Sequence, residues 1–482
     1  MTEPANILVV SDLHFGEELL PGATTERRHA VELGARAFRE FLHYHASRRL
    51  GGRPWRLVIA GDLFDFMSVV VPGSPDLPAR TLDERSFGLD RSTLSGVLRM
   101  RRICENHREL LADMVRFTSA GHTIDIIVGN HDVELLAPEV CAELDHSIRR
   151  LAGASDAAAE RIQVVPWFIY LPGTAWIEHG HVYDEGCSFE FNLAPADPRD
   201  GRIISNVDYA AIRYLATTSP EIDPHGIEEW GFWGYMQYGW DVGIRSLLRM
   251  WAGYARFAMS LVRARARHQS FKGREVRRRM HRERLAQVAE AGGLPVETAS
   301  AIDRLARTPM TVSWRRLGRM LMLDRFGMAI GMLFVMMVLF LLLPFWWALL
   351  GLAAAAAGAG WLHAWLGKHM VTSQLPMRAV PMRIKKLVDA PLVVFGHTHD
   401  PRWQPLRSGG LYINSGTWLP ATRPGLRRSF THVLIQPRPG SSPLVELRQW
   451  RDGTSQPFDA SADLGAGVTA PGTAPSDWTN VA

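Results

Sequence analysis

Five short polar motifs in this sequence contain the residue types that bind metal ions. They are Asp12 to His14, Gly61 to Asp65, Gly129 to Asp132, His179 to His181 and Gly396 to His399. Their carboxylates, imidazoles and one amide oxygen, without thiolates, suit Mn, Fe, Zn, Ni or Co. The number of donors exceeds what one ion needs, so the motifs predict two divalent metal ions whose identity stays open.

A pair of such ions is suited to phosphoryl chemistry. Two cations about 3.5–4 Å apart can hold the attacking and leaving oxygens of an in-line displacement, and they make hydroxide available at neutral pH. A bridging carboxylate suits such a pair of cations. A protonated imidazole can donate to the leaving oxygen, which contributes about 10²- to 10⁴-fold in rate.

The elements that must position these motifs are short apolar runs that read as strands. Strands are predicted near 7–10, 57–60, 123–128, 175–178, 392–395, 411–413 and 432–435, with helical patterns near 26–50 and 93–120. This rhythm indicates an α/β (α+β) fold. Each metal-binding motif directly follows a strand. Because ligands bind beyond the carboxyl ends of strands in open α/β sheets, the five motifs are expected to meet at one rim.

The order Asp-x-His, Gly-Asp, Gly-Asn-His-Asp, His, Gly-His-x-His resembles the motif set of the calcineurin-like metallophosphoesterase superfamily, across about 1–195 and 380–450. The resemblance implies a sandwich of two sheets flanked by helices. It implies that Asp12, His14 and His399 hold one metal. Asn130, His179 and His397 would hold the other, with Asp62 bridging them. It also implies that His131 protonates the leaving oxygen or stabilises phosphoryl charge, and that Asp132 orients His131.

Within that superfamily the opening motifs and Gly-His-Thr-His are similar to those of UDP-2,3-diacylglucosamine pyrophosphatases, which act on a lipid at the membrane surface. The sequence departs from them at Gly129 to Asp132, where those enzymes typically carry Gly-Asn-Arg-Asp. They also lack a long membrane-spanning insertion. The substrate is therefore not carried over from that subfamily.

A long insertion separates the two blocks of strands. Residues 245–284 contain 13 Lys and Arg against two acids, although the whole chain has a net charge of only +5. Residues 244–267 read as an amphipathic helix, with an aromatic-rich apolar face and a basic face. Such a helix can lie in a membrane interface, which we favour, or can pack on the rest of the insertion.

Residues 326–366 contain no Asp, Glu, Lys or Arg over 41 positions. One crossing needs about 20 apolar residues, and Pro344 divides the run into two segments, so a transmembrane helical hairpin is predicted. Arg and Lys on both flanks place both ends in the cytoplasm. An even number of crossings also lets His179 and His397, on either side of the run, share one site. A buried helix pair or a re-entrant element is the alternative.

The predicted organisation has five parts: 1–195 and 367–451 as the two halves of the metallophosphoesterase domain, 196–325 as a basic helical insertion, 326–366 as the hairpin, and 452–482 as a disordered tail. The tail has no Lys or Arg and many Gly, Ala, Pro, Ser and Thr. Three cysteines without a CxxC pair fit a reducing compartment, and no secretory signal is evident. Cys187 reads as a small buried hydrophobe.

These features predict a metal-dependent phosphoric ester hydrolase at the inner (cytoplasmic) membrane, with its catalytic domain facing the cytoplasm. Its substrate would carry a phosphomonoester, phosphodiester or pyrophosphate bond, including lipid pyrophosphates, and membrane lipids would be partners. The alternatives are a nuclease that uses the basic segment and a membrane-anchored scaffold without activity; nucleic acid is the less favoured partner. His181 reads as a rim residue. Asp65, Glu178 and Asp184 could either orient ligands or cap helices and form salt bridges.

Overall fold

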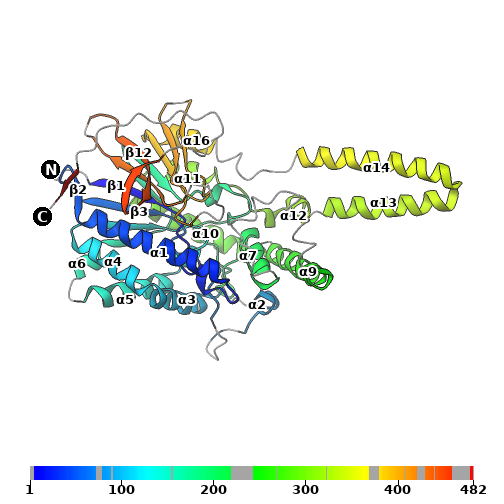
Figure 1. The fold of residues 1–482 in the computed structure, drawn as a ribbon, viewed down its shortest axis with the longest axis horizontal. Helices are drawn as coiled ribbons and strands as arrows, with labels where there is room; N and C mark the ends of the chain where they lie inside the picture. Colours follow the sequence, from blue (N-terminus) through cyan, green and yellow to red (C-terminus); the bar gives the residue numbers. More distant parts are fainter. Residues whose placement is uncertain are drawn as a thin grey trace.

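The computed structural model describes residues 5–480 except 72–76, 78, 88–90, 154–155, 219–242, 269, 322, 369–378, 408, 421–428, 439 and 459–477. It contains a mixed α/β body from which two long helices project (Figure 1).

The first sheet has seven strands in the order β13-β12-β11-β1-β3-β4-β5. Strands β1, β3, β4 and β5 are parallel, and β11, β12 and β13 continue the sheet in antiparallel fashion. The strands are β1 (Asn6–Val10), β3 (Trp55–Ala60), β4 (Thr123–Ile127), β5 (Ile162–Val165), β11 (Thr431–Gln436), β12 (Leu444–Arg451) and β13 (Thr454–Pro457).

The second sheet has five strands in the order β6-β7-β8-β10-β9, and it faces the first. Strands β7, β8 and β10 are parallel, with antiparallel strands at both edges. One apolar cluster contains Val9 and Val58 from the first sheet and Val394 from the second, so the two sheets share a core. The strands are β6 (Phe168–Leu171), β7 (Ala175–Glu178), β8 (Leu392–Phe395), β9 (Arg402–Pro405) and β10 (Leu411–Asn414).

Helices cover the outer faces of both sheets. On the first sheet lie α1 (Thr25–Ala46), α3 (Thr93–Asn106), α4 (Arg108–Ser119), α5 (Pro138–Ala152) and α6 (Asp156–Ala159). On the second lie α10 (Phe271–Ala291), α11 (Val296–Asp303) and α16 (Val380–Leu387). The short elements are η1 (Glu17–Leu19), η2 (Val133–Leu136), η3 (His181–Tyr183), α2 (Leu82–Phe87) and η5 (Met310–Val312). The expected two-sheet α/β architecture is thus observed.

The predicted strands agree with the observed ones to within two residues at each end. The long helical pattern predicted at 93–120 differs, because it is interrupted at His107, whose φ of −103° and ψ of 30° are not helical. The pattern predicted at 26–50 also ends early. Residues 48–50 form β2 (Arg48–Leu50) instead.

The insertion has a small core of its own. Helices α7 (Val207–Thr218), α9 (Gly243–His268) and α12 (Trp314–Met320) meet through Val207, Phe257, Leu261 and Leu317. Helix α9 was predicted to lie in a membrane interface, but over residues 252–268 this is wrong. Phe257 and Leu261 are 4% and 0% exposed because α7 and α12 cover them.

Basic residues of the insertion contact acids elsewhere in the chain, two in the body and one in the insertion itself. Arg263 pairs with Asp83, Arg267 with Asp200 at 3.2 Å, and Arg274 with Glu190 at 2.6 Å. Much of the positive charge in the described part of this segment is therefore paired with acidic side chains of the same chain.

Helices α13 (Leu323–Leu342) and α14 (Phe345–Lys368) form a hairpin with its turn at Leu343 and Pro344, where the sequence places the division. It extends away from the body (Figure 1). Leu341, Leu342 and Trp346 near the turn are 74%, 75% and 78% exposed. Among the residues described, no helix combines the length and the apolar character that a membrane crossing requires. The transmembrane hairpin thus has no support beyond the sequence.

The expectation of disorder from residue 452 onward is wrong for residues 454–457. These residues form β13, which pairs with β12 through a tight turn at Asp452 and Gly453, both of which have positive φ. Asp-Gly between two strands is a strong hairpin signal that composition alone conceals. Residues 478–480 form β14 (Trp478–Asn480), which pairs with β2. The tail between these strands lies outside the described residues.

The core beneath the first sheet contains a buried histidine that should make stability depend on pH. His45 is 0% exposed, its Nδ1 lies 2.9 Å from the Phe41 carbonyl, and burial lowers its pKa from 6.5 to about 3. Between these values the unfolded chain binds more protons, so the stability that is complete above pH 6.5 is lost as the pH falls toward 3.

We expect the free energy of unfolding to fall by up to about 1.4 kcal/mol per pH unit through this group. His45→Gln should flatten the dependence between pH 6.5 and 4, as measured by urea denaturation. His146→Gln, at an exposed position, is the control. Equal slopes for wild type and His45→Gln would contradict the prediction.

Candidate metal centre

Loops at the carboxyl ends of β1, β3, β4, β7 and β8 meet at one rim, as the sequence predicts. Backbone hydrogen bonds join these loops directly. The Asp12 amide donates to the Gly61 carbonyl at 3.1 Å, and the Gly396 amide donates to the His179 carbonyl at 3.0 Å. The rim is therefore a hydrogen-bonded unit, although its parts are up to about 385 residues apart in the chain.

The backbone is strained at this rim. Among the described residues, seven other than glycine have positive φ, and five of these are expected metal ligands: Asp12, His14, Asp62, His397 and His399, with φ between 52° and 70°. This conformation costs about 1–2 kcal/mol per residue for an ordinary side chain. Its concentration at one rim indicates that folding maintains these side-chain directions for a function.

At two positions of the motifs a carboxylate from a neighbouring loop comes so close to the backbone that only glycine fits. A Cβ at Gly129 would overlap Oδ1 of Asp62, and a Cβ at Gly396 would lie 2.8 Å from Oδ2 of Asp12. The Gly-Asn and Gly-His steps in the sequence thus leave room for carboxylates that enter from neighbouring loops.

The three residues of the first predicted ligand set, Asp12, His14 and His399, lie close together. Nε2 of His399 lies 3.1 Å from Oδ1 of Asp12 and 3.3 Å from Nε2 of His14. One potential donor atom from each of these three residues falls within 4.8 Å of the others. Two imidazole nitrogens that face each other beside a carboxylate form a plausible set of ligands for one cation.

The second set adjoins the first through Asp62, which is 1% exposed. Oδ2 of Asp62 lies 3.1 Å from Nε2 of His179 and 3.9 Å from Nε2 of His14, a ligand of the first set. The side-chain oxygen of Asn130 lies 3.1 Å from the same nitrogen of His179. Asp62 therefore lies between the imidazoles of the two expected ligand sets.

His397 is at the rim but turned toward a different group. Its Nε2 lies 3.5 Å from Oδ2 of Asp184, and its potential donor atoms gather with those of Asp184 and Cys187. Its ring centroid is 5.2 Å from that of His179. The structure thus brings His397 beside the second set without including it in the tight cluster around Asp62.

The charge states of the carboxylates fit cation binding. Burial opposes ionisation of Asp62, but His179, His131 and His14 hold its pKa well below 3.8. Burial also opposes ionisation of Asp12, and His399 and His179 more than offset it, so this pKa is lowered as well. Two buried, ionised carboxylates among imidazole nitrogens match the preference of divalent transition metals.

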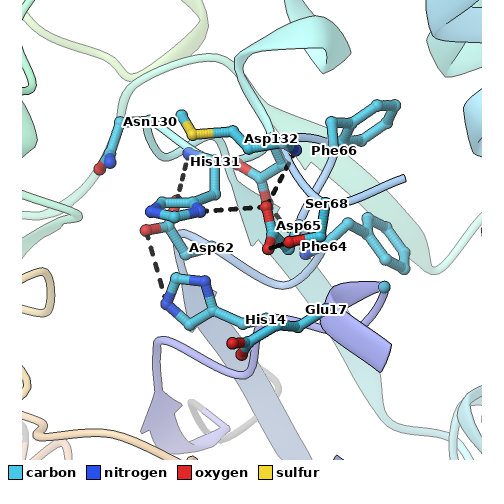
Figure 2. A network of polar contacts seen from close by, with 12 residues as sticks. His14, Glu17, Asp62, Phe64, Asp65, Phe66, Ser68, Asn130, His131 and Asp132 are labelled. Carbon is cyan, nitrogen blue, oxygen red and sulfur yellow. Dashed lines mark hydrogen bonds and ion pairs between the residues drawn. The ribbon is translucent and has the colours of Figure 1, made fainter. Parts of the chain in front are cut away.

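His131 lies beside this cluster and contacts a carboxylate other than the one predicted. Figure 2 shows its ring between Asp62 and Asp65, with Nδ1 at 3.2 Å from Oδ1 of Asp65. Burial lowers the pKa of His131, but Asp62, Asp65 and Asp208 together raise it well above 6.5. The three carboxylates therefore favour the protonated form of the imidazole.

The prediction that Asp132 orients His131 is wrong. Oδ1 of Asp132 accepts the Gly129 amide at 2.6 Å, and Oδ2 accepts the Leu63 amide at 2.9 Å. Asp132 therefore joins the loops after β3 and β4. Its burial, together with Asp62, raises its pKa to about 7. Asp65, for which the sequence left two roles open, is the residue that contacts His131.

The remaining polar residues of the motifs divide into structural and orienting roles. Both oxygens of Glu178 accept hydrogen bonds, from Trp167, Trp176 and Tyr183, so this carboxylate supports the second sheet. Asp184 contacts His397, with its Oδ2 3.5 Å from Nε2 of that residue. His181 is 7% exposed and its ring lies 5.3 Å from that of His179.

Sequence reasoning missed Asp208, near the start of α7. Its Oδ2 accepts a hydrogen bond from Nδ2 of Asn130 at 2.9 Å and lies 3.7 Å from Nε2 of His131. No motif distinguishes this aspartate from others in the insertion, and only the return of the chain to the rim reveals it.

Comparison with known proteins found no matching family model and no matching curated protein. The interpretation of the site therefore depends on the residues and their geometry.

The bridging position of Asp62 leads to a test that needs no substrate. Asp62→Asn should reduce bound Mn²⁺ from about two ions per chain to less than one, because both sets lose their shared anionic oxygen. Metal content would be measured by mass spectrometry after dialysis. Asp125→Asn, which removes a buried carboxylate from β4, is the matched control. Full metal content in Asp62→Asn would refute the bridging assignment.

Proposed function

We propose that this chain is a metallophosphoesterase of the calcineurin-like type, which hydrolyses a phosphomonoester, phosphodiester or pyrophosphate bond with two divalent cations. The observation that carries the proposal is the convergence of Asp12, Asp62 and His179 within one buried cluster, adjoined by His14 and His399. Such a set, with a bridging carboxylate, suits a pair of cations better than a single one.

The residues would divide the work as follows. The cations, when bound, would supply a nucleophile from water at neutral pH and neutralise phosphoryl charge. Asp62 would hold both cations at a fixed separation. His131 would donate a proton to the leaving oxygen through Nε2, because its Nδ1 is turned toward Asp65. Asp65 would fix the ring in that orientation.

The proton-donor assignment predicts a loss of rate without a loss of metal. His131→Ala should lower kcat for an aryl phosphoester by about 10²- to 10⁴-fold, and Asp65→Asn by about 10- to 100-fold. Both variants should keep the Mn²⁺ content of wild type. The assay would follow nitrophenol release from mono- and bis-nitrophenyl phosphate, with Asp125→Asn as control.

Unchanged rates in both variants would refute these roles. A wild-type protein that holds two Mn²⁺ but hydrolyses neither these substrates nor lipid pyrophosphates and nucleotides would favour the non-catalytic scaffold. The structure does not favour the nuclease alternative, because Arg263, Arg267 and Arg274 already pair with acidic residues of the chain.

We also propose that the α13–α14 hairpin attaches the protein to the inner membrane and that the substrate is a lipid-linked phosphoester. Exposed apolar surface of this extent is typical of membrane or protein contacts. Three of the most exposed side chains, Leu341, Leu342 and Trp346, lie at the turn farthest from the body. Exposed Arg315 and Arg319 lie on α12, at the base of the hairpin, where anionic headgroups of the cytoplasmic leaflet would meet them.

Two charges at the turn should abolish membrane attachment. A buried charge costs about 2.5–3.5 kcal/mol on insertion scales, so Leu341→Glu/Leu342→Glu should remain in the soluble fraction when wild type floats with phosphatidylcholine–phosphatidylglycerol vesicles. Leu82→Glu, at a 59% exposed leucine on α2, is the control. Equal flotation of the double variant would contradict lipid contact at the turn. Loss of self-association without any effect on flotation would indicate that a second copy covers the hairpin.

A further inference from the structure

The first segment of the insertion returns to the metal centre and is fixed there by hydrogen bonds. The amides of Val207 and Asp208 donate to the Gly186 carbonyl at 3.1 and 3.2 Å. Nδ2 of Asn206 donates to the Cys187 carbonyl at 2.6 Å. The start of α7 is thereby joined to the loop that follows β7 and His179.

This attachment places a carboxylate against the one amide ligand. Asp208 accepts a hydrogen bond from Nδ2 of Asn130, while the oxygen of the same amide faces Nε2 of His179. A carboxylate cannot donate, so the opposite amide orientation would put two oxygens together. Asp208 therefore determines that Asn130 presents its oxygen, and not its nitrogen, to the second ligand set.

Among the residues that the structure describes, the Asp208 side chain contacts residues of the rim. Within the described residues, neither Lys nor Arg forms an ion pair with it; its contacts are with Asn130 and with His131 at 3.7 Å. The Asp208 side chain is 21% exposed, and the groups that it faces, the Asn130 amide and the His131 imidazole, both belong to the rim. Its placement at the rim is therefore better explained by the site than by the stability of the insertion.

A second carboxylate, Asp184 in the loop after β7, acts in parallel. Oδ1 of Asp184 accepts the Gly186 amide at 2.7 Å, which leaves Oδ2 facing Nε2 of His397 at 3.5 Å. The Gly186 peptide thus contacts Asp184 through its amide and α7 through its carbonyl. Both orienting carboxylates belong to one hydrogen-bonded frame.

We propose that Asp208 is a positioning residue for the second cation, and that the insertion thereby completes one of the two cation sites while leaving the other unchanged. This inference rests on the proposed dinuclear centre. Residues that orient metal ligands typically contribute 10- to 100-fold in metal affinity.

The test is a calorimetric titration of the dialysed full-length protein with Mn²⁺. Asp208→Asn should weaken binding of the second Mn²⁺ by about 10- to 100-fold and leave the first within about twofold. Asp200→Asn is the matched control, because Asp200 lies in the same segment but pairs with Arg202 and Arg267. A merely structural role for Asp208 would affect both sites together.

Exchanging the two side chains gives a stricter test. In Asn130→Asp/Asp208→Asn the amide at 208 can donate to the carboxylate at 130, so the second Mn²⁺ should bind more tightly than in Asp208→Asn alone. No difference between Asp208→Asn and wild type, equal weakening of both ions, or complete loss of the second ion would each overturn the positioning role. Wild-type protein that binds fewer than about two Mn²⁺ would instead refute the dinuclear centre.

Discussion

The rim depends on one buried carboxylate. Asp62 lies within 3.9 Å of imidazole nitrogens from two separate ligand sets, and its Oδ1 accepts the backbone amide of His131 at 2.9 Å. An ionised carboxylate at 1% exposure is unfavourable unless positive or polar groups surround it. The loops after β1, β4 and β7 supply such groups. The ends of these strands must therefore converge if Asp62 is to stay ionised in the interior.

The backbone is strained at several of the residues that surround Asp62. Asp12, Asp62 and His399 have positive φ in the loops that follow β1, β3 and β8, a conformation that is unfavourable for these side chains. The surrounding hydrogen bonds between loops keep these conformations in place. Asp132 provides two of these hydrogen bonds, because its carboxylate accepts backbone amides from the loops after β3 and β4. A residue adjacent to His131 thus acts on the backbone of two loops of the rim.

Much of the fold could be predicted because its signals are local. Apolar runs followed by Gly-Asp, Gly-Asn or Gly-His indicate both the strands and the ligands, and β1, β8 and β10 lie where their sequence runs indicate. The errors concern information that is not local. The choice between Asp65 and Asp132 depends on side-chain direction in a strained loop. The packing of Phe257 depends on helices distant in sequence, and Asp208 lies 78 residues from the amide that donates to it.

The insertion connects the rim and the α13–α14 hairpin, which the sequence presents as separate features. Helix α7 carries Asp208 at the metal rim and packs with α9 and α12 in one small core, and α12 lies directly before α13 and contacts it. Because a packed core resists deformation, side-chain packing holds α12, from which this arm of the hairpin continues, against α7 and α9. If the hairpin contacts lipid, the same core would set the height and tilt of the cation site above the surface. A lipid-linked phosphate could then meet the rim without leaving the bilayer, which gives a physical reason for placing a ligand-orienting residue in the insertion.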